Sequence, residues 1–141
     1  LDFKNRHRPV MGPGYTELFF LDEVTALAAG HRPCFECRRT AARAFFFAHG
    51  QDLRAPEMDR LLHTERLGPP YPDINPSDAP DGAMFLIGDT PHARRGNHLL
   101  RWTPRGYDRP IPLGKITTAR PLTPPTTLGI LAAGYQPVWY E

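Results

Sequence analysis

The sequence predicts an α+β fold with a helical N-terminal half and a small antiparallel β meander in the C-terminal half. Segments with helical spacing of apolar residues, closed by glycines, precede residue 68. Short apolar runs separated by turn signals follow residue 82. We expect residues 1–67, a proline-rich linker at 68–82 and a β-rich lobe at 83–141 to form one compact domain, because 141 residues is an ordinary size for one domain.

Composition fits many short elements joined by irregular connections. The 17 prolines and 12 glycines are typical of a turn-rich chain, while aromatic residues spread along the sequence exclude extensive disorder. The net charge of +2 is too small to imply a polyanionic partner by itself. Basic residues nevertheless gather near the N-terminus, although a solvated face would give the same pattern: Lys4, Arg6, Arg8, Arg32, Arg38, Arg39 and Arg43.

No apolar run is long enough to cross a membrane, and no signal peptide is visible, so we expect a cytoplasmic protein with no membrane partner. The first residue is Leu1 rather than methionine. We therefore expect a further N-terminal segment to precede it. Oligomeric state is not predicted by any feature of the chain.

The N-terminal half contains one expected strand and three expected helices, at residues 15–20, 21–30, 38–49 and 55–67. In the first helix, Asp22 is positioned to cap the N-terminus and Gly30 to end the helix. Asp22 and Glu23 are interpreted as charges that complement the helix dipole. The second helix ends in three phenylalanines at 45–47, and we expect that end to be buried.

The C-terminal half contains a meander of short strands, expected at residues 83–87, 91–96 and 98–102, with a further strand at 116–119. Residues 128–138, LGILAAGYQPV, repeat the pattern of residues 24–34, VTALAAGHRPC. The shared elements are a short helix, a glycine, a ring side chain and a proline. An internal duplication would explain this repeated pattern, but repeated use of one helix-ending motif is the favoured interpretation.

Cys34 and Cys37 are the only cysteines, and their C-x2-C spacing lets two thiolates converge on one metal ion. A structural zinc ion needs four ligands, and the nearest histidines that could add to the pair are His31 and His7. Two alternatives remain open. The cysteines could form a thiol-redox pair, whose pKa nearby arginines would lower, or they could be two ordinary buried thiols.

Residues 19–39, FFLDEVTALAAGHRPCFECRR, resemble the second half of the zinc-binding module of Ada-type DNA alkylation-repair proteins. The resemblance implies that Cys34 and Cys37 are two of four zinc ligands and that the module binds DNA. In that family an earlier cysteine pair precedes the strand, and one of its thiols accepts the methyl group. Residues 1–14 contain no cysteine, so the resemblance does not extend to methyl transfer.

The whole chain also resembles a family of uncharacterised conserved bacterial proteins. The segments that carry this resemblance are MGPGYTELFFLDEVTALAAGHRPCFECRR, EMDRLLHTERL and LTPPTTLGILAAGYQPVW. It implies a longer N-terminus with adjacent cysteines, which would supply the missing ligands. It implies no activity.

The leading functional prediction is a zinc-stabilised module that binds DNA or RNA phosphates through four arginines: Arg32, Arg38, Arg39 and Arg43. The alternative is a metal-dependent nuclease or other hydrolase. Its candidate catalytic residues are His63, Glu65 and Asp59, since His63 and Asp59 share a helix face. A third hypothesis is a thiol-redox protein. No phosphate-binding glycine loop, nucleophile elbow or H-E-x-x-H motif occurs, which excludes several large enzyme classes.

Overall fold

The computed structural model describes residues 21–141, so the predicted strand at 15–20 and His7 lie outside the described residues. The α+β class is confirmed, because helices accompany a five-stranded antiparallel sheet. The α-helices are α1 (Glu23–Ala28), α2 (Arg39–His49), α3 (Ala55–Leu67) and α4 (Pro125–Ala132). The strands are β1 (Met84–Ile87), β2 (Thr90–Arg95), β3 (His98–Thr103), β4 (Gly106–Pro112) and β5 (Arg120–Pro121). Among the helices of the described residues, none is long and apolar enough to cross a membrane.

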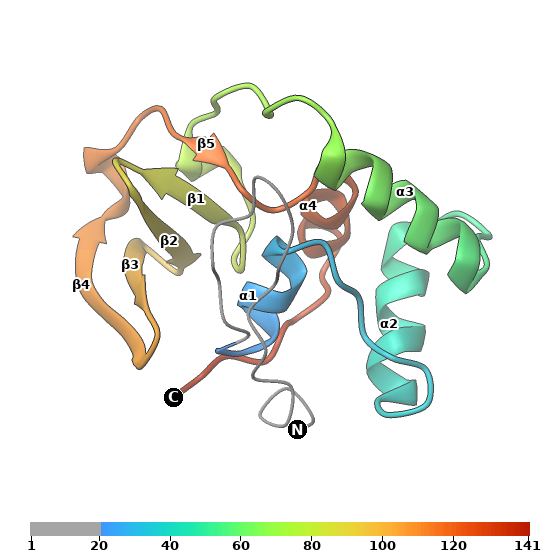
Figure 1. Ribbon diagram of the computed structural model, residues 1–141. Coiled ribbons are helices and arrows are strands. Elements are labelled where there is room, and N and C mark those ends of the chain that lie inside the picture. Colours follow the sequence, from blue (N-terminus) through green and yellow to red (C-terminus); the bar gives the residue numbers. More distant parts are fainter. Residues whose placement is uncertain (1–20) are drawn as a thin grey trace.

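The sheet lies at one end of the molecule and α2 with α3 at the other, with α1 and α4 between them (Figure 1). Its strand order is β4-β3-β2-β1-β5, so β1 to β4 form the predicted meander and β5 pairs with the other edge of β1. The strand predicted at 116–119 is wrong, since only Ala119 pairs there, in an isolated bridge with Ile74. Sequence inspection also missed β4, because it carries Pro110 and Pro112. An edge strand tolerates prolines, since one side of it needs no N–H donors.

Residues 68–82 are hydrogen-bonded to the β-rich part of the chain, although they contain many prolines. Ile74 and Ala119 exchange both backbone hydrogen bonds, at N···O distances of 3.0 and 2.9 Å. A short 3₁₀ helix, η2 (Pro76–Asp78), follows and is capped by the side chain of Asn75. The guanidinium of Arg94 on β2 donates to the carbonyl oxygens of Pro76, Ser77 and Ala79. This segment therefore lies against the sheet over much of its length.

Helix α1 packs against two apolar clusters, one beside the sheet and one between the helices. Its Val24 and Ala28 pack with Met84 of the sheet, whereas Leu27 packs into the cluster between the helices. All six residues of the helix are buried. The cluster between the helices is built on α2, α3 and α4 and contains Phe45, Met58, Leu62, Ile130, Leu131 and Tyr135.

The phenylalanine run of α2 is only partly buried. Phe45 is fully buried and stacks edge-on against Tyr135, with ring centroids 5.4 Å apart. Phe47 is 86% exposed. Successive residues of an α-helix point about 100° apart, so three in a row cannot all face one core. The expected burial of this whole end is therefore wrong for Phe47.

The echo between residues 24–34 and 128–138 is a repeated local geometry. Gly30 and Gly134 adopt φ values of 92° and 115°, in the left-handed region that favours glycine. At both helix ends the glycine N–H bonds three residues back, and the next N–H bonds five residues back, in the same pattern. The ring residues after these glycines, His31 and Tyr135, therefore leave their helices in equivalent directions.

The two glycines differ in what surrounds them, which gives a matched pair of variants. We expect Gly134→Ala to cost about 1–2 kcal/mol of the free energy of unfolding, because alanine resists a positive φ and the space beside Gly134 is open. Gly30→Ala should cost more, since its added Cβ would lie 3.1 Å from Cδ of Arg66. Urea denaturation measures both variants. An equal or smaller loss for Gly30→Ala would show that Arg66 yields freely.

Candidate functional site

The two cysteines lie in a tight turn between α1 and α2. The turn is closed by the backbone N–H of Arg38, which donates to the carbonyl oxygen of Cys34 at 2.8 Å. Cys34 is half-buried and Cys37 is exposed, and no disulfide joins the two. The side chains of Cys34 and Cys37 lie side by side, 3.7 Å apart. We call residues 34–38 the thiol turn.

The thiol turn favours the thiolate form of Cys34. The backbone N–H groups of Cys37 and Glu36 and the Cys37 thiol donate to the Cys34 sulfur and hold its pKa below the ordinary value. Donors of this kind stabilise negative charge on sulfur, which is the state that binds metal ions. The hydrogen bonds to the Cys34 sulfur therefore favour the thiolate, the form in which cysteine binds a metal ion.

Zinc fits the thiol turn as half of a site. Two thiolates held about 2.3 Å from one tetrahedral zinc ion lie about 3.8 Å apart, close to the spacing of this pair. Within residues 21–141, no group of three or more His, Cys, Asp or Glu residues could hold a metal ion. His31 therefore does not form such a group with the two cysteines, and His7 lies outside the described residues. Within the described residues, Cys34 and Cys37 are thus the pair whose spacing suits two zinc ligands.

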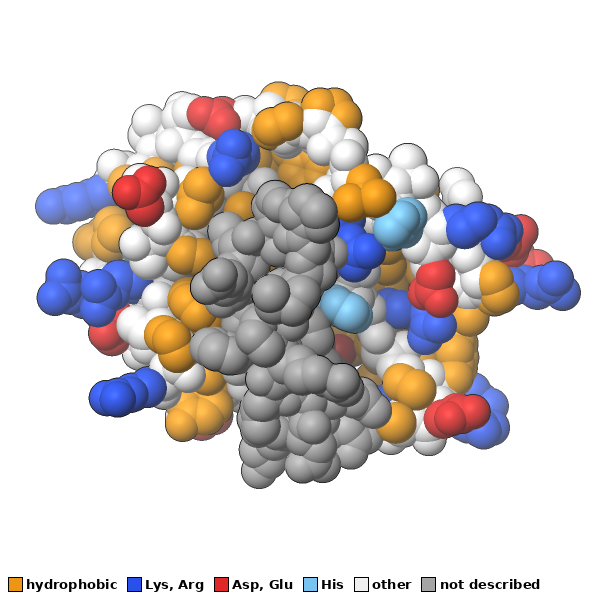
Figure 2. Space-filling model, in the orientation of Figure 1, with side chains coloured by type: hydrophobic (Ala, Val, Ile, Leu, Met, Phe, Trp, Pro, Cys, Tyr) orange, Lys and Arg blue, Asp and Glu red, His pale blue; other side chains and the backbone are white. Residues whose placement is uncertain are grey.

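A pocket of about 800 Å³ opens beside the thiol turn, between the segment at 30–34 and α3. Figure 2 shows histidine and basic side chains gathered on this face, over α3. We call it the α3 pocket. It brings together His31, Arg32 and Cys34 with Asp59 and His63, which the sequence assigned to two separate candidate sites. The described residues that line it are Gly30, His31, Arg32, Cys34, Asp59, Arg60, His63, Thr64 and Arg66.

Asp59, the only carboxylate among the described residues of this lining, is already paired. Arg32 donates two charged hydrogen bonds to Asp59, from Nε to Oδ1 at 2.7 Å and from Nη2 to Oδ2 at 3.1 Å. The same guanidinium lies 5.8 Å from the ring centroid of Phe35 and 5.9 Å from that of Phe46. Arg32 is thereby held in the wall of the pocket, and its charge is balanced by Asp59.

His63 is oriented by the next turn of its own helix. Nη2 of Arg66 lies 2.9 Å from Nδ1 of His63. A guanidinium can only donate, so Nδ1 accepts and we assign the proton of the neutral ring to Nε2. In this tautomer the outer nitrogen of His63 is a hydrogen-bond donor, which suits an anion better than it suits a general base.

Arg38 is directed away from this pocket and into the interior. Its Nη1 lies 2.8 Å from Oε2 of Glu23, whose side chain is fully buried. The same carboxylate accepts the hydroxyl of Tyr135, and its Oε1 accepts the backbone N–H of Val138 at 2.9 Å. Burial and the hydrogen bond to Glu23 raise the pKa of Tyr135, so the phenol stays neutral. Glu23 lies in the first turn of α1, as expected, and its side chain also ties the thiol turn to the C-terminal segment.

Asp22, by contrast, caps α1 as expected, with its Oδ1 accepting the backbone N–H of Thr25 at 3.0 Å. It has a second role that the sequence does not indicate. Its carboxylate also accepts the hydroxyl of Tyr107 and, at 2.9 Å, the backbone N–H of Tyr140. The start of α1 is therefore linked to the sheet and to the end of the chain.

The remaining candidate residues are dispersed. Arg39 and Arg43 are exposed on α2, and Arg39 lines a second open pocket, of about 910 Å³, between α2 and the end of α4. Glu65 does not line the α3 pocket, because its carboxylate accepts the backbone N–H of Thr126 at 3.0 Å and so caps α4. The hydrolase candidates His63 and Asp59 share the pocket, while Glu65 faces the other way.

Sequence inspection missed Arg60 as a member of the site and assigned no role to Thr64 and Arg66. The signal that could have found Arg66 is its position three residues after His63, on the same face of α3. Nothing in the sequence predicts that this face lies opposite the segment at 30–34, since that depends on the packing of α3.

Compared with protein-family models, curated proteins and solved structures, the chain has no match in any of the three. Function is therefore inferred from the residues of the thiol turn and the α3 pocket.

Proposed function

We propose that the protein is a nucleic-acid-binding module that holds phosphates of DNA or RNA at the α3 pocket. The observation that carries the proposal is the charge of this pocket. Among residues 21–141, its lining contains three guanidinium groups and one carboxylate, and that carboxylate is already bound by Arg32. This excess of basic side chains, with the exposed Arg60 among them, would attract phosphate oxygens and release counterions from the nucleic acid.

Zinc belongs to this proposal as a structural element. Cys34 and Cys37 would hold the ion, which would rigidify the thiol turn without taking part in a reaction. Their spacing and the N–H donors around Cys34 support this role. A rigid thiol turn would in turn fix the wall of the pocket that carries Arg32.

The four arginines of the sequence prediction now divide into two pairs. Arg32 is bound to the exposed Asp59 and Arg38 to the buried Glu23, so we assign both arginines to positioning. Arg39 and Arg43, on the exposed face of α2, are assigned to further phosphates along a bound strand. The hydrolase alternative is less favoured, because Asp59 and Glu65 are both engaged and His63 presents a donor.

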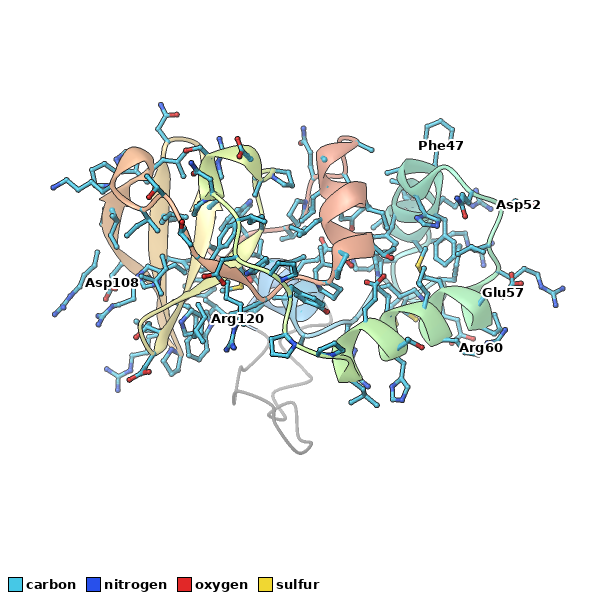
Figure 3. The ribbon with its side chains drawn as sticks, turned by 90° about the horizontal axis from the view of Figure 1, so that it is seen from above. Phe47, Asp52, Glu57, Arg60, Asp108 and Arg120 are labelled. Carbon is cyan, nitrogen blue, oxygen red and sulfur yellow. The ribbon has the colours of Figure 1, made fainter. Side chains whose placement is uncertain are left out.

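Fluorescence anisotropy with a labelled oligonucleotide of mixed sequence tests the proposal. We expect the logarithm of the binding constant to fall linearly with the logarithm of the salt concentration, with a slope of roughly −0.7 per neutralised phosphate for a single strand. Arg60→Gln should weaken binding and reduce the slope by about 0.7, the share of one phosphate contact. Arg60 projects from α3, at the far end of the molecule from Arg120 on β5 (Figure 3).

Arg120→Gln is the matched control, since it removes an exposed arginine outside the pocket. It should change the affinity less than Arg60→Gln does. Failure to bind single- or double-stranded DNA and RNA at low salt would refute the proposal. A binding constant that does not change with the salt concentration would refute it as well.

A further inference from the structure

We propose that helix α2 carries a surface for single-stranded nucleic acid, on which Arg39 and Arg43 hold phosphates and the ring of Phe47 stacks on a base. This inference rests on the proposed function and specifies its substrate class, a strand with unpaired bases rather than a duplex. Its basis is the alignment of two exposed guanidinium groups with an exposed aromatic ring on one face of α2. We call these three residues the α2 stripe.

The members of the α2 stripe are spaced four residues apart on a regular helix. Positions i and i+4 lie on the same face, about 6 Å apart along the helix axis, so the three side chains follow one another in a row. The helix itself, RTAARAFFFAH, contains no acidic residue, and its N-terminus at Arg39 adds the partial positive charge of the helix dipole. The nearest acidic residues in the chain, Glu36 and Asp52, lie before and after the helix. The stripe thus offers positive charge to a strand that runs along α2.

Phe47 is not used by the packing of α2. Phe45 is fully buried, and Phe46 packs against Phe35 with ring centroids 5.1 Å apart. The side chain of Phe47 is 86% exposed, the highest value among the large hydrophobic side chains of the described residues. Figure 3 shows it projecting outward from α2, on the side of this end of the molecule away from Arg60. Its ring is therefore accessible to a planar ligand.

An open pocket beside the α2 stripe has room for a base. It lies between α2 and the end of α4, and the described residues that line it include both Arg39 and Phe47. Small residues, among them Ala44, Ala48 and Gly134, form much of the remaining lining. Its volume of about 910 Å³ falls within the range of small-molecule sites, roughly 300–1,000 Å³. A flat base could therefore lie against the ring without displacing a large side chain.

The ring is the feature that favours a single strand. In a duplex the bases cover one another and present only their edges in the grooves, whereas an unpaired base exposes its flat face. A basic row combined with an aromatic ring is typical of surfaces that bind single strands with little sequence preference. An apolar contact with a protein partner would need bulk at residue 47 but no flat face. Substitutions of Phe47 can therefore distinguish the two kinds of partner.

Fluorescence anisotropy tests the inference with three forms of one labelled oligonucleotide: the single strand, its duplex, and a strand of equal length with abasic sites. We expect the single strand to bind most tightly. Phe47→Ala should weaken its binding about tenfold, the scale of one base stacked on an aromatic ring. The salt slope should stay unchanged, because the ring neutralises no phosphate. The same variant should have little effect on the duplex or on the abasic strand.

Two further substitutions of Phe47 and one of Arg43 are the controls. Phe47→Trp keeps a flat ring and should retain the affinity, whereas Phe47→Leu keeps only apolar bulk and should bind as weakly as Phe47→Ala. Arg43→Gln should reduce the salt slope by about 0.7 for single strands, with or without bases. Residue 47 is exposed, so we expect its variants to fold, which circular dichroism checks.

The outcomes separate the inference from the proposed function. Salt-dependent binding that is equally strong in the wild-type protein and in Phe47→Ala would overturn the inference and leave the function standing. Full affinity in Phe47→Leu, an equal loss on the abasic strand, or tighter binding of the duplex would also overturn it. Self-association that disappears in Phe47→Ala, measured by sedimentation, would instead assign the ring to a contact between copies of the chain. No binding of any probe would refute both.

Discussion

Replacing Arg38 by alanine is expected to lower the free energy of unfolding by about 3–5 kcal/mol. The change strands a carboxylate inside the protein: Glu23 is fully buried, and Arg38 is its cation at 2.8 Å. The hydroxyl of Tyr135 and the N–H of Val138 would remain as donors, but neither carries a positive charge. The loss should exceed that of any substitution on the exposed face of α2.

Arg39→Ala is the matched control, because Arg39 is the adjacent residue and is exposed. It should change the stability by no more than about 0.5 kcal/mol. A double variant, Glu23→Gln with Arg38→Met, should recover much of the loss, since it removes both charges together. Urea denaturation followed by circular dichroism measures all three proteins. Similar losses for Arg38→Ala and Arg39→Ala would show that Glu23 does not depend on its ion pair.

Substitution of Cys34 by serine is expected to release zinc and to destabilise the protein substantially. Under the proposed function the full-length protein should contain about one zinc ion per chain. Binding to the native state alone stabilises it by about 4 kcal/mol when free zinc exceeds the dissociation constant about 1,000-fold. Serine cannot replace the thiolate that the N–H groups of Cys37 and Glu36 support. We therefore expect Cys34→Ser to bring the wild-type stability down to its value in a strong chelator.

Elemental analysis and thermal unfolding with and without chelator measure these effects. The chelator should lower the Tm of the wild-type protein and leave that of Cys34→Ser unchanged. Thiol titration adds an independent readout, because the thiols of Cys34 and Cys37 should become reactive only after zinc is removed. A purified protein with no zinc and no titratable thiols would instead contain a Cys34–Cys37 disulfide, and the thiol-redox hypothesis would replace the zinc proposal.

Local signals determined much of the fold. The cap at Asp22, the glycine at 30 and Pro56 near the start of α3 define helix ends through the backbone alone, so the sequence places these helices well. The turn at Gly88 likewise defines the hairpin of β1 and β2. β4 and β5 were less predictable, because a proline-containing edge strand and a two-residue strand exist only by pairing with neighbours.

The residues of the site were predictable one by one, but their grouping was not. Chemistry identified Cys34 and His63 from their residue types, yet they lie 29 positions apart and share a pocket only because α3 packs beside the segment at 30–34. Tertiary structure also separated the basic residues, since Arg32 and Arg38 meet acidic partners whereas Arg60 forms no ion pair within residues 21–141. The sequence by itself determined which side chains could bind metal or phosphate. Burial and long-range ion pairs, which depend on the packed fold, decided which of them hold the structure together and which remain exposed to solvent.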